Sequence, residues 1–305
     1  MKTLVLLGPT AVGKTKLSIE LAKTFNAEII SADSMQVYRG MDIGTAKPTL
    51  EERQGIPHHL IDVRNPDEEW TVSDFVGEVQ NLKVKIKNKG KIPIIVGGTG
   101  LYLWSLLEGF AFPISPADKE VRARLEQRPT ATLYAQLSMI DPEAAGKIHA
   151  NDKKRIIRAL EVYELTGKPI SELQRLRQIN SPHLSVGNNE FFVIGLNLPR
   201  EELYPRINAR VDNMIAKDLI DEVKGLLAKG FSKGLNSFQA LGYKEVIEYL
   251  DGKWTKDQLI DELKKRTRHF ARRQMTWFRR FKDVQWFSPD EKDAIIKLCG
   301  KEIKK

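Results

Sequence analysis

The chain has 305 residues, 41% of them hydrophobic and 29% charged, a composition typical of a soluble globular protein with one or two domains. No apolar run approaches about 18 residues and the chain opens on a strand-like segment, so we expect no membrane helix, no targeting peptide and a cytoplasmic location. The single cysteine, Cys299, excludes a disulfide framework and a multi-cysteine zinc site, whereas the net charge of +9 indicates an acidic partner.

The first predicted element is an apolar strand over residues 3–7, and the eight residues after it have the pattern of a phosphate-binding loop. In this pattern, glycines let successive backbone N–H groups point at one anion, and the next helix adds its positive N-terminal end. A lysine supplies charge for the terminal phosphate, and the hydroxyl of Thr15 can ligate Mg²⁺, the cofactor that we expect. The loop consists of Gly8, Pro9, Thr10, Ala11, Val12, Gly13, Lys14 and Thr15.

A second predicted strand, residues 27–30, leads to Asp33. A carboxylate just beyond such a strand lies at the edge of an α/β sheet where ligands bind, close to the phosphate-binding loop. From its position alone, Asp33 could be a general base, a metal ligand or a helix N-cap. Further along, His58 and His59 are adjacent, and because neighbouring side chains of a strand face opposite sides, they cannot chelate one metal together.

Further strands are predicted at residues 59–62, 92–96 and 191–196, separated by helical stretches, which is the pattern of a parallel sheet with helices on both faces. The fourth strand ends in a glycine-rich turn with Thr99, whose hydroxyl either reaches the same anion or only shapes the turn. Between the fourth and fifth strands we predict an α-helical insertion. Its helical patterns lie at 118–128, 131–139, 153–166 and 170–177.

The C-terminal third is predicted to be nearly all helical and strongly basic. Arg206 and Arg210 lie four residues apart on one helix face, where they could contact an anion or belong to a surface ion-pair cluster. Between Lys264 and Lys282 there are nine Lys or Arg residues and no acidic residue. This stripe indicates nucleic acid, although a docking helix with a solvated basic face is the alternative. A seam at helical spacing accompanies it: Phe270, Gln274, Trp277, Phe278 and Phe281.

Several motifs, in order along most of the chain, resemble those of the tRNA dimethylallyltransferase (isopentenyl-tRNA transferase) family of bacterial type. They are the phosphate-binding loop, residues 31–48, His58 to Asp62, Gly97 to Tyr102, Asn151 to Arg155, Arg158 to Glu161, Arg206 to Asp212, and Gly242 to Glu245. The resemblance implies transfer of a dimethylallyl group from dimethylallyl diphosphate to N6 of an adenosine in the tRNA anticodon loop, at position 37.

The resemblance also implies roles for individual residues. Asp33 would be the base that takes the N6 proton, and Thr99 and Arg210 would contact the diphosphate; these three are the expected catalytic residues. Asp33 and Thr99 would also contact the tRNA, together with the residues that hold the extruded adenine: Ser34, Met35 and Gln36. Further tRNA contacts are expected at the insertion, where solvated helix surface is the alternative: Arg122, Lys154, Arg155, Ile156, Ile157 and Arg158.

The expected fold is a P-loop NTPase-like parallel sheet flanked by helices, with a helical insertion domain. Residues 1–112 would form the first part of the core, 113–185 the insertion with its tRNA contacts, and 186–305 the rest of the core with the basic helices. We expect a monomer that binds tRNA and dimethylallyl diphosphate. Two other functions are possible from the same residues. The loop and Asp33 would equally suit a small-molecule or nucleotide kinase. The loop together with the basic stripe would suit a nucleic-acid-stimulated NTPase.

Overall fold

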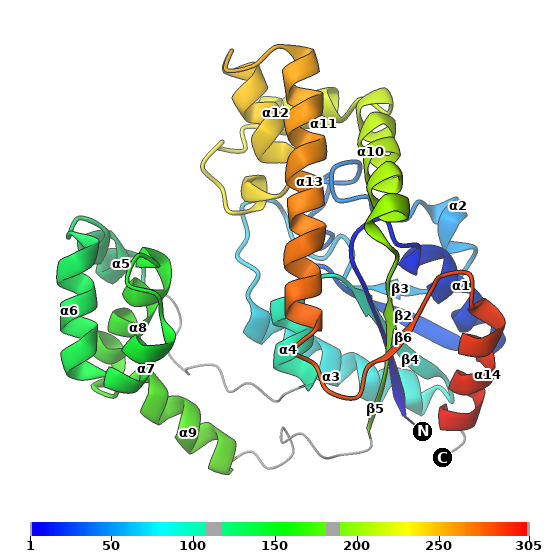
Figure 1. The fold of residues 1–305 in the computed structure, drawn as a ribbon, viewed down its shortest axis with the longest axis horizontal. Coiled ribbons are helices and arrows are strands. Elements are labelled where there is room, and N and C mark those ends of the chain that lie inside the picture. The colour runs from blue at the N-terminus through cyan, green and yellow to red at the C-terminus, as the bar shows by residue number, and fades with distance from the viewer. Residues whose placement is uncertain (1, 108–117, 181–189, 304–305) are drawn as a thin grey trace. The chain divides into compact units, whose positions relative to one another are not determined.

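Six parallel strands form one sheet in the computed structural model, which describes residues 2–107, 118–180 and 190–303 (Figure 1). The strand order is β3-β2-β4-β1-β5-β6. The strands are β1 (Thr3–Leu7), β2 (Ala27–Ala32), β3 (His58–His59), β4 (Ile92–Gly97), β5 (Phe191–Leu196) and β6 (Gln285–Phe287). This order brings the carboxyl ends of β1, β2 and β4 side by side, and each of them leads into a predicted ligand-binding segment. The fold is the expected α/β class.

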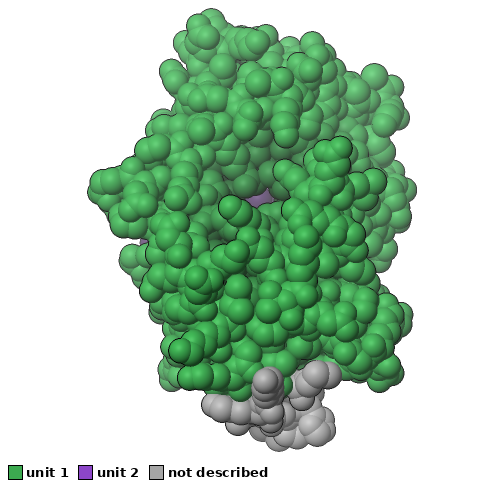
Figure 2. Space-filling model, turned by 90° about the vertical axis from the view of Figure 1, so that its right-hand side faces the viewer, with its two compact units in different colours: residues 1–104, 188–305 green, residues 105–187 purple. Residues whose placement is uncertain are grey.

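The chain forms two compact units, coloured separately in Figure 2: residues 1–104 with 188–305, and residues 105–187. Helix α4 (Gly100–Leu107) contains the boundary between them. The expected ends of the insertion, residues 113 and 185, lie outside the described residues.

The first unit carries the sheet and most of the helices. They are α1 (Lys14–Thr24), α2 (Leu50–Arg53), α3 (Val72–Asn88), α10 (Arg200–Ala216), α11 (Leu219–Ala228), the 3₁₀-helix η2 (Ser237–Gln239), α12 (Tyr243–Leu250), α13 (Lys256–Phe278) and α14 (Lys292–Ile303). Threonine caps begin three of them, α2, α3 and α13. Thr71 accepts a hydrogen bond from the Asp74 amide at the start of α3, and Thr255 accepts one from the Gln258 amide at the start of α13.

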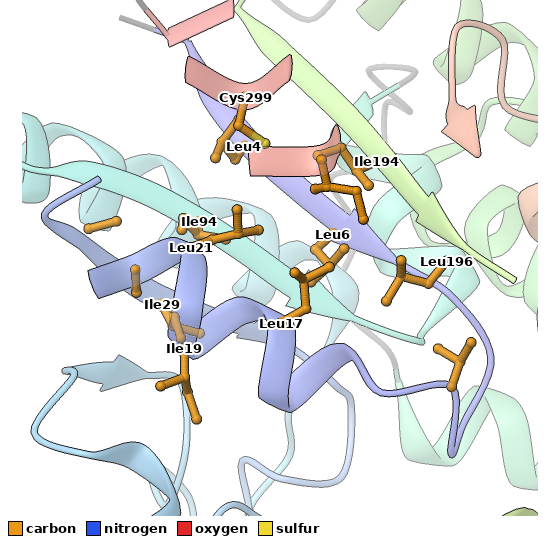
Figure 3. Close-up of a cluster of buried hydrophobic side chains, with 14 of the residues drawn as sticks. Leu4, Leu6, Leu17, Ile19, Leu21, Ile29, Ile94, Ile194, Leu196 and Cys299 are labelled. Carbon is orange, nitrogen blue, oxygen red and sulfur yellow. The ribbon is translucent and has the colours of Figure 1, made fainter. Parts of the chain in front are cut away.

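The core of the first unit lies where α1 and α14 cover the sheet. Figure 3 shows Leu17 and Leu21 of α1 among side chains of β1 and β4, with Cys299 of α14 beside Leu4. All five residues of β1 are buried, as expected for a central strand of a parallel sheet with both faces covered. Burial raises the pKa of the Cys299 thiol to about 12, so this side chain packs and does not act as a thiolate.

The third strand differs from its prediction. The sequence predicts a strand at residues 59–62, whereas β3 consists of His58 and His59 alone. Leu60 and Asp62 have φ values of 60° and 57°, and these left-handed conformations end the strand. Strand β6 was not predicted, because it is only three residues long and lies at an edge of the sheet where Trp286 is 39% exposed.

The second unit is helical in its described part. Its helices are α5 (Lys119–Glu126), α6 (Thr130–Ile140), α7 (Pro142–Lys147), α8 (Lys153–Thr166) and α9 (Ile170–Asn180). Helix α7, which the hydrophobic pattern did not predict, starts at an Asp141 side chain that accepts from the Ala144 amide. Ile156 and Ile157, which are expected among the tRNA contacts, have side chains buried in the apolar core of this unit.

Candidate active site

The phosphate-binding loop joins β1 to α1 in the first unit. Gly13 is the N-cap of α1 with a φ of 106°, a left-handed conformation that glycine adopts without strain. The Lys14 ammonium donates to the carbonyl oxygens of Gly8 and Pro9, at 2.8 Å each. The lysine therefore folds back over the loop, at the N-terminus of a helix of 11 residues.

A cavity of about 360 Å³ opens beside this loop, entirely within the first unit. Asp33, beyond β2, and Arg210, on α10, line it together with the loop. The sequence therefore identified charged groups from three distant segments that share one cavity. The other lining residues include Thr10, Ala11, Gly13, Lys14, Thr15, Lys16, Ser18, Ser31, Gln36, His58, Gly98, Phe270 and Gln274.

The electrostatics of the cavity favour an anion. Burial, and then the nearby Arg210, lower the pKa of Lys14 to about 7, while Asp33 opposes the shift. Burial also lowers the pKa of the Arg210 guanidinium, again with Asp33 opposing. Two cations thus share this space with one carboxylate, Asp33, which opposes both shifts, while Glu52 opposes the shift of Arg210 as well. An anionic ligand would raise the pKa of the lysine toward its ordinary value.

The Asp33 side chain holds a turn beyond β2, and no described helix begins there, so Asp33 is not a helix N-cap. Its Oδ1 accepts from the Met35 amide at 2.9 Å and from the Gln36 amide at 3.4 Å, as an aspartate in a turn does. The same side chain lines the cavity beside Lys14 and Arg210. The two amide bonds fix the carboxylate in place, which is what a positioned base requires.

The segment expected to hold an adenine is tied to its surroundings. The Thr99 hydroxyl accepts from the Ser34 amide at 3.0 Å, so the glycine-rich turn contacts the residue next to Asp33. The Gln36 amide group accepts from the Ser31 hydroxyl at 2.9 Å and donates to the carbonyls of Thr45 and Ala46 at 3.3 and 3.4 Å. A base would therefore meet a Gln36 side chain that is already held by the protein.

Glu222 of α11 holds the segment that Gln36 contacts. Its carboxylate accepts from three consecutive backbone amides, those of residues 42–44, at 2.8 to 3.3 Å. The Tyr243 hydroxyl also donates to it. Sequence analysis did not identify this residue, because its partners lie about 180 positions away and no motif marks it.

The donor set at the loop fits Mg²⁺. This ion usually keeps several waters and binds one or two side-chain oxygens together with substrate phosphates. Thr15 and Asp33 bring a hydroxyl and a carboxylate to the cavity, and Ser18 donates to the Thr15 carbonyl at 2.8 Å, which fixes the first turn of α1. Among the residues the structure describes, here or elsewhere, no cluster of three or more His, Cys, Asp or Glu could hold a metal.

His58 and His59 contact different groups of the protein. His59 Nε2 lies 2.8 Å from Glu28 Oε2, and His58 Nδ1 lies 2.8 Å from the Ile56 carbonyl oxygen. His58 also lines the cavity, which the sequence did not predict.

In the second unit, the predicted arginines surround a buried carboxylate. Arg122 Nε and Arg158 Nη1 lie 2.9 and 2.7 Å from Glu161, whose side chain is fully buried. Arg155 pairs with Asp152 at 3.2 Å, and Lys154 is exposed. Because three of these basic side chains are paired with carboxylates, tRNA contact and a solvated helix surface both remain open for this part of the second unit.

The basic stripe lies mainly on α13, and its two halves differ. The N-terminal half is paired: Lys264 with Asp212 at 2.6 Å, and Arg266 with Glu245 at 2.9 Å. Arg268 donates to Asn208 at 2.7 Å. The basic residues toward the C-terminal end are exposed: Arg272, Arg273, Arg279, Arg280 and Lys282. The part of the stripe suited to a polyanion is therefore shorter than the sequence suggests.

The sheet, the loop and the cavity define a P-loop-like α/β protein with a charged cavity beside the loop. The family model described as IPP transferase matches residues 36–281, and this chain belongs to that family. The proteins it is similar to include the tRNA dimethylallyltransferases of Alkaliphilus oremlandii, 48% identical over 98% of this chain and 95% of the relative, and of Thermotoga neapolitana, 50% identical over 94% and 92%.

Solved structures of the same family superpose on this chain. The tRNA isopentenylpyrophosphate transferase of Bacillus halodurans superposes with a TM-score of 0.73 at 43% identity, covering 99% of this chain and 97% of that one. A eukaryotic dimethylallyltransferase described as acting on tRNA superposes with a TM-score of 0.76 at 35% identity, covering 90% and 69%. The family resemblance drawn from the sequence motifs is confirmed.

Proposed function

We propose that this protein transfers a dimethylallyl group from dimethylallyl diphosphate to N6 of an adenosine in tRNA, at position 37 of the anticodon loop. The observation that carries the proposal is the grouping of Lys14, Arg210 and Asp33 around one cavity in a chain of this family. Two cations suit a diphosphate leaving group, and a fixed carboxylate suits removal of one proton.

The leaving group sets the first requirement. When the allylic C–O bond breaks, the diphosphate departs with the electron pair and its negative charge grows. Lys14, Arg210 and the amides of the loop stabilise that charge, and they do so in a partly enclosed site where electrostatic interactions are stronger than in water. Mg²⁺ held by Thr15 and diphosphate oxygens would supply further charge.

The nucleophile sets the second requirement. The N6 lone pair is delocalised into the purine ring, so the amine attacks poorly until a base accepts its proton as the C–N bond forms. Asp33 is a carboxylate that lines the cavity. The hydrogen bonds described for it come from two backbone amides, and they hold the carboxylate in a fixed orientation. The proton passes to Asp33. Adenines in a single-stranded loop can leave their stack at low cost.

The tRNA is expected to contact the exposed arginines after Arg268 on α13 and the basic residues of the second unit. We infer that the protein works as a monomer in the cytoplasm, where its tRNA substrate is found. No helix among residues 2–107, 118–180 and 190–303 is long and apolar enough to cross a membrane. The kinase and NTPase alternatives are not favoured, because the relatives are named for dimethylallyl transfer.

Asp33→Ala tests this function. Loss of a general base is expected to lower turnover roughly 10²–10⁴-fold, while binding of inorganic diphosphate and tRNA persists because the carboxylate acts on a proton. Single-turnover transfer to a tRNA transcript measures the rate, and equilibrium titrations measure the two affinities. Near-normal turnover would leave Asp33 with its role in the turn alone. ATP that outcompetes dimethylallyl diphosphate for the loop would favour a kinase or NTPase.

A further inference from the structure

Gln274 joins the phosphate-binding loop to the glycine-rich turn beyond β4. Its side chain is 5% exposed and comes from the C-terminal part of α13. The side-chain oxygen accepts from the Thr10 backbone amide at 2.9 Å, and the side-chain nitrogen donates to the Gly98 carbonyl at 2.9 Å. The sequence assigned this residue to an apolar seam, and it is buried, but its amide spans two loops that are 88 residues apart in the chain.

The chemistry of the two contacts specifies a carboxamide. One partner is a donor and the other an acceptor, and the side-chain amide of Asn or Gln presents both functions in one planar group without a change of protonation. A carboxylate has no donor for the Gly98 carbonyl, and an ammonium has no acceptor for the Thr10 amide. Gly98 must also lack a side chain, because a Cβ there would lie 2.3 Å from the Gln274 nitrogen.

The two loops carry the two halves of the reaction. Thr10 belongs to the loop that holds the diphosphate, and Gly98 precedes Thr99. Thr99 in turn accepts from the Ser34 amide at 3.0 Å, and its own amide donates to the Ala32 carbonyl at 3.3 Å. Hydrogen bonds, with the peptide bond between Gly98 and Thr99, therefore connect the leaving-group side through Gln274 to the residues on either side of Asp33.

We propose that Gln274 is a positioning residue that fixes the separation between the diphosphate loop and the segment bearing the base. This inference rests on the proposed function. A small misplacement of reacting groups costs about 100-fold in rate even when each group remains bound. The defect on losing Gln274 should thus appear in kcat, with little change in ground-state binding of either ligand.

Gln274→Met tests the proposal, because methionine keeps the length and helix propensity of the side chain but removes both hydrogen bonds. We expect kcat to fall about 100-fold, while Kd for inorganic diphosphate stays within about threefold. The control is Thr267→Val on the same helix: Thr267 is also buried, but its hydroxyl donates only to Leu263 within α13. This control should keep the parent kcat.

Hydrogen exchange supplies a readout that does not depend on activity. The Thr10 amide should exchange slowly in the parent and much faster in Gln274→Met. In Thr267→Val its exchange rate should equal that of the parent. If Gln274→Met does not fold, Gly98→Ala displaces the same amide from the other side and should show both the kcat loss and the faster exchange at Thr10.

The outcomes are distinct. Parent protein without transfer activity contradicts the proposed function, and the exchange data then still decide whether Gln274 holds the loop. Active parent with a Gln274→Met kcat within threefold of it, or with unchanged Thr10 exchange, overturns the positioning role. A loss confined to thermal stability, with kcat retained below the unfolding transition, assigns Gln274 to packing alone.

Discussion

The affinity for diphosphate is expected to fall with rising pH because of Lys14. Its pKa is lowered to about 7, whereas an unperturbed lysine titrates near 10.5. A bound diphosphate favours the charged lysine, so binding above pH 7 must be coupled to uptake of a proton. Inorganic diphosphate also changes its own charge in this range, and the Lys14→Met variant, which meets the same ligand, corrects for that contribution.

The size of the effect follows from the pKa. The fraction of free protein with a charged Lys14 falls from about one quarter at pH 7.5 to about one hundredth at pH 9, so Kd for diphosphate should rise about 25-fold over that interval. At pH 8, binding should take up about 0.9 proton per site. The sign for folding is the reverse: because the folded pKa lies below the unfolded one, the stability of the unliganded protein gains from this group as pH rises from about 7 to 10.5.

Isothermal titration of inorganic diphosphate, in buffers with different ionisation enthalpies, measures both Kd and proton uptake. Lys14→Met should bind weakly with little pH dependence, and Lys23→Met, an exposed lysine on the same helix, should keep the parent profile. The electrostatic account is refuted if the parent Kd is constant between pH 7.5 and 9, or if Lys14→Met retains the parent's dependence.

Two further predictions concern the tRNA surface and the second unit. Replacing Arg272 and Arg279 with Gln should weaken tRNA binding. The slope of log affinity against log salt concentration should shrink by about 0.7–0.9 per lost phosphate contact. The control is the double variant Lys85→Gln/Lys229→Gln, and a slope equal to that of the control would assign the stripe to a solvated face. Glu161→Ala should destabilise the second unit by roughly 1–3 kcal/mol, less than for fully buried pairs because its arginine partners are partly exposed. Hydrogen exchange in α5 and α8 checks this, and parent-like protection would contradict it.

Local patterns in the sequence predicted the parts of the fold that depend on local rules. The phosphate-binding loop and β1, β2, β4 and β5 were predicted because glycine spacing and apolar runs encode them directly. Strand β3 was predicted too long, because the left-handed backbone at Leu60 and Asp62 has no signal in hydrophobicity. The three-residue β6 depends on pairing with β5, a tertiary contact that a single sequence does not reveal.

The candidate site shows the same division. Lys14 and Asp33 follow strand ends, where chemistry-bearing residues are expected, and Arg210 came from the family motif. Gln274 and Glu222 were not assigned to the site, since their partners are backbone groups of distant loops. A polar residue within an otherwise apolar helical seam is the one signal that pointed toward Gln274.

Attachment of a five-carbon group to adenosine in tRNA is open to a direct measurement. The most direct measurement is to incubate it with dimethylallyl diphosphate, Mg²⁺ and unmodified tRNA, and then to digest the tRNA and identify its nucleosides by mass spectrometry. The account predicts N6-dimethylallyladenosine at the position after the anticodon, formed in step with diphosphate release and lost with Asp33→Ala. Unmodified tRNA, together with ATP-dependent phosphorylation or nucleic-acid-stimulated ATP hydrolysis by the same preparation, would contradict it.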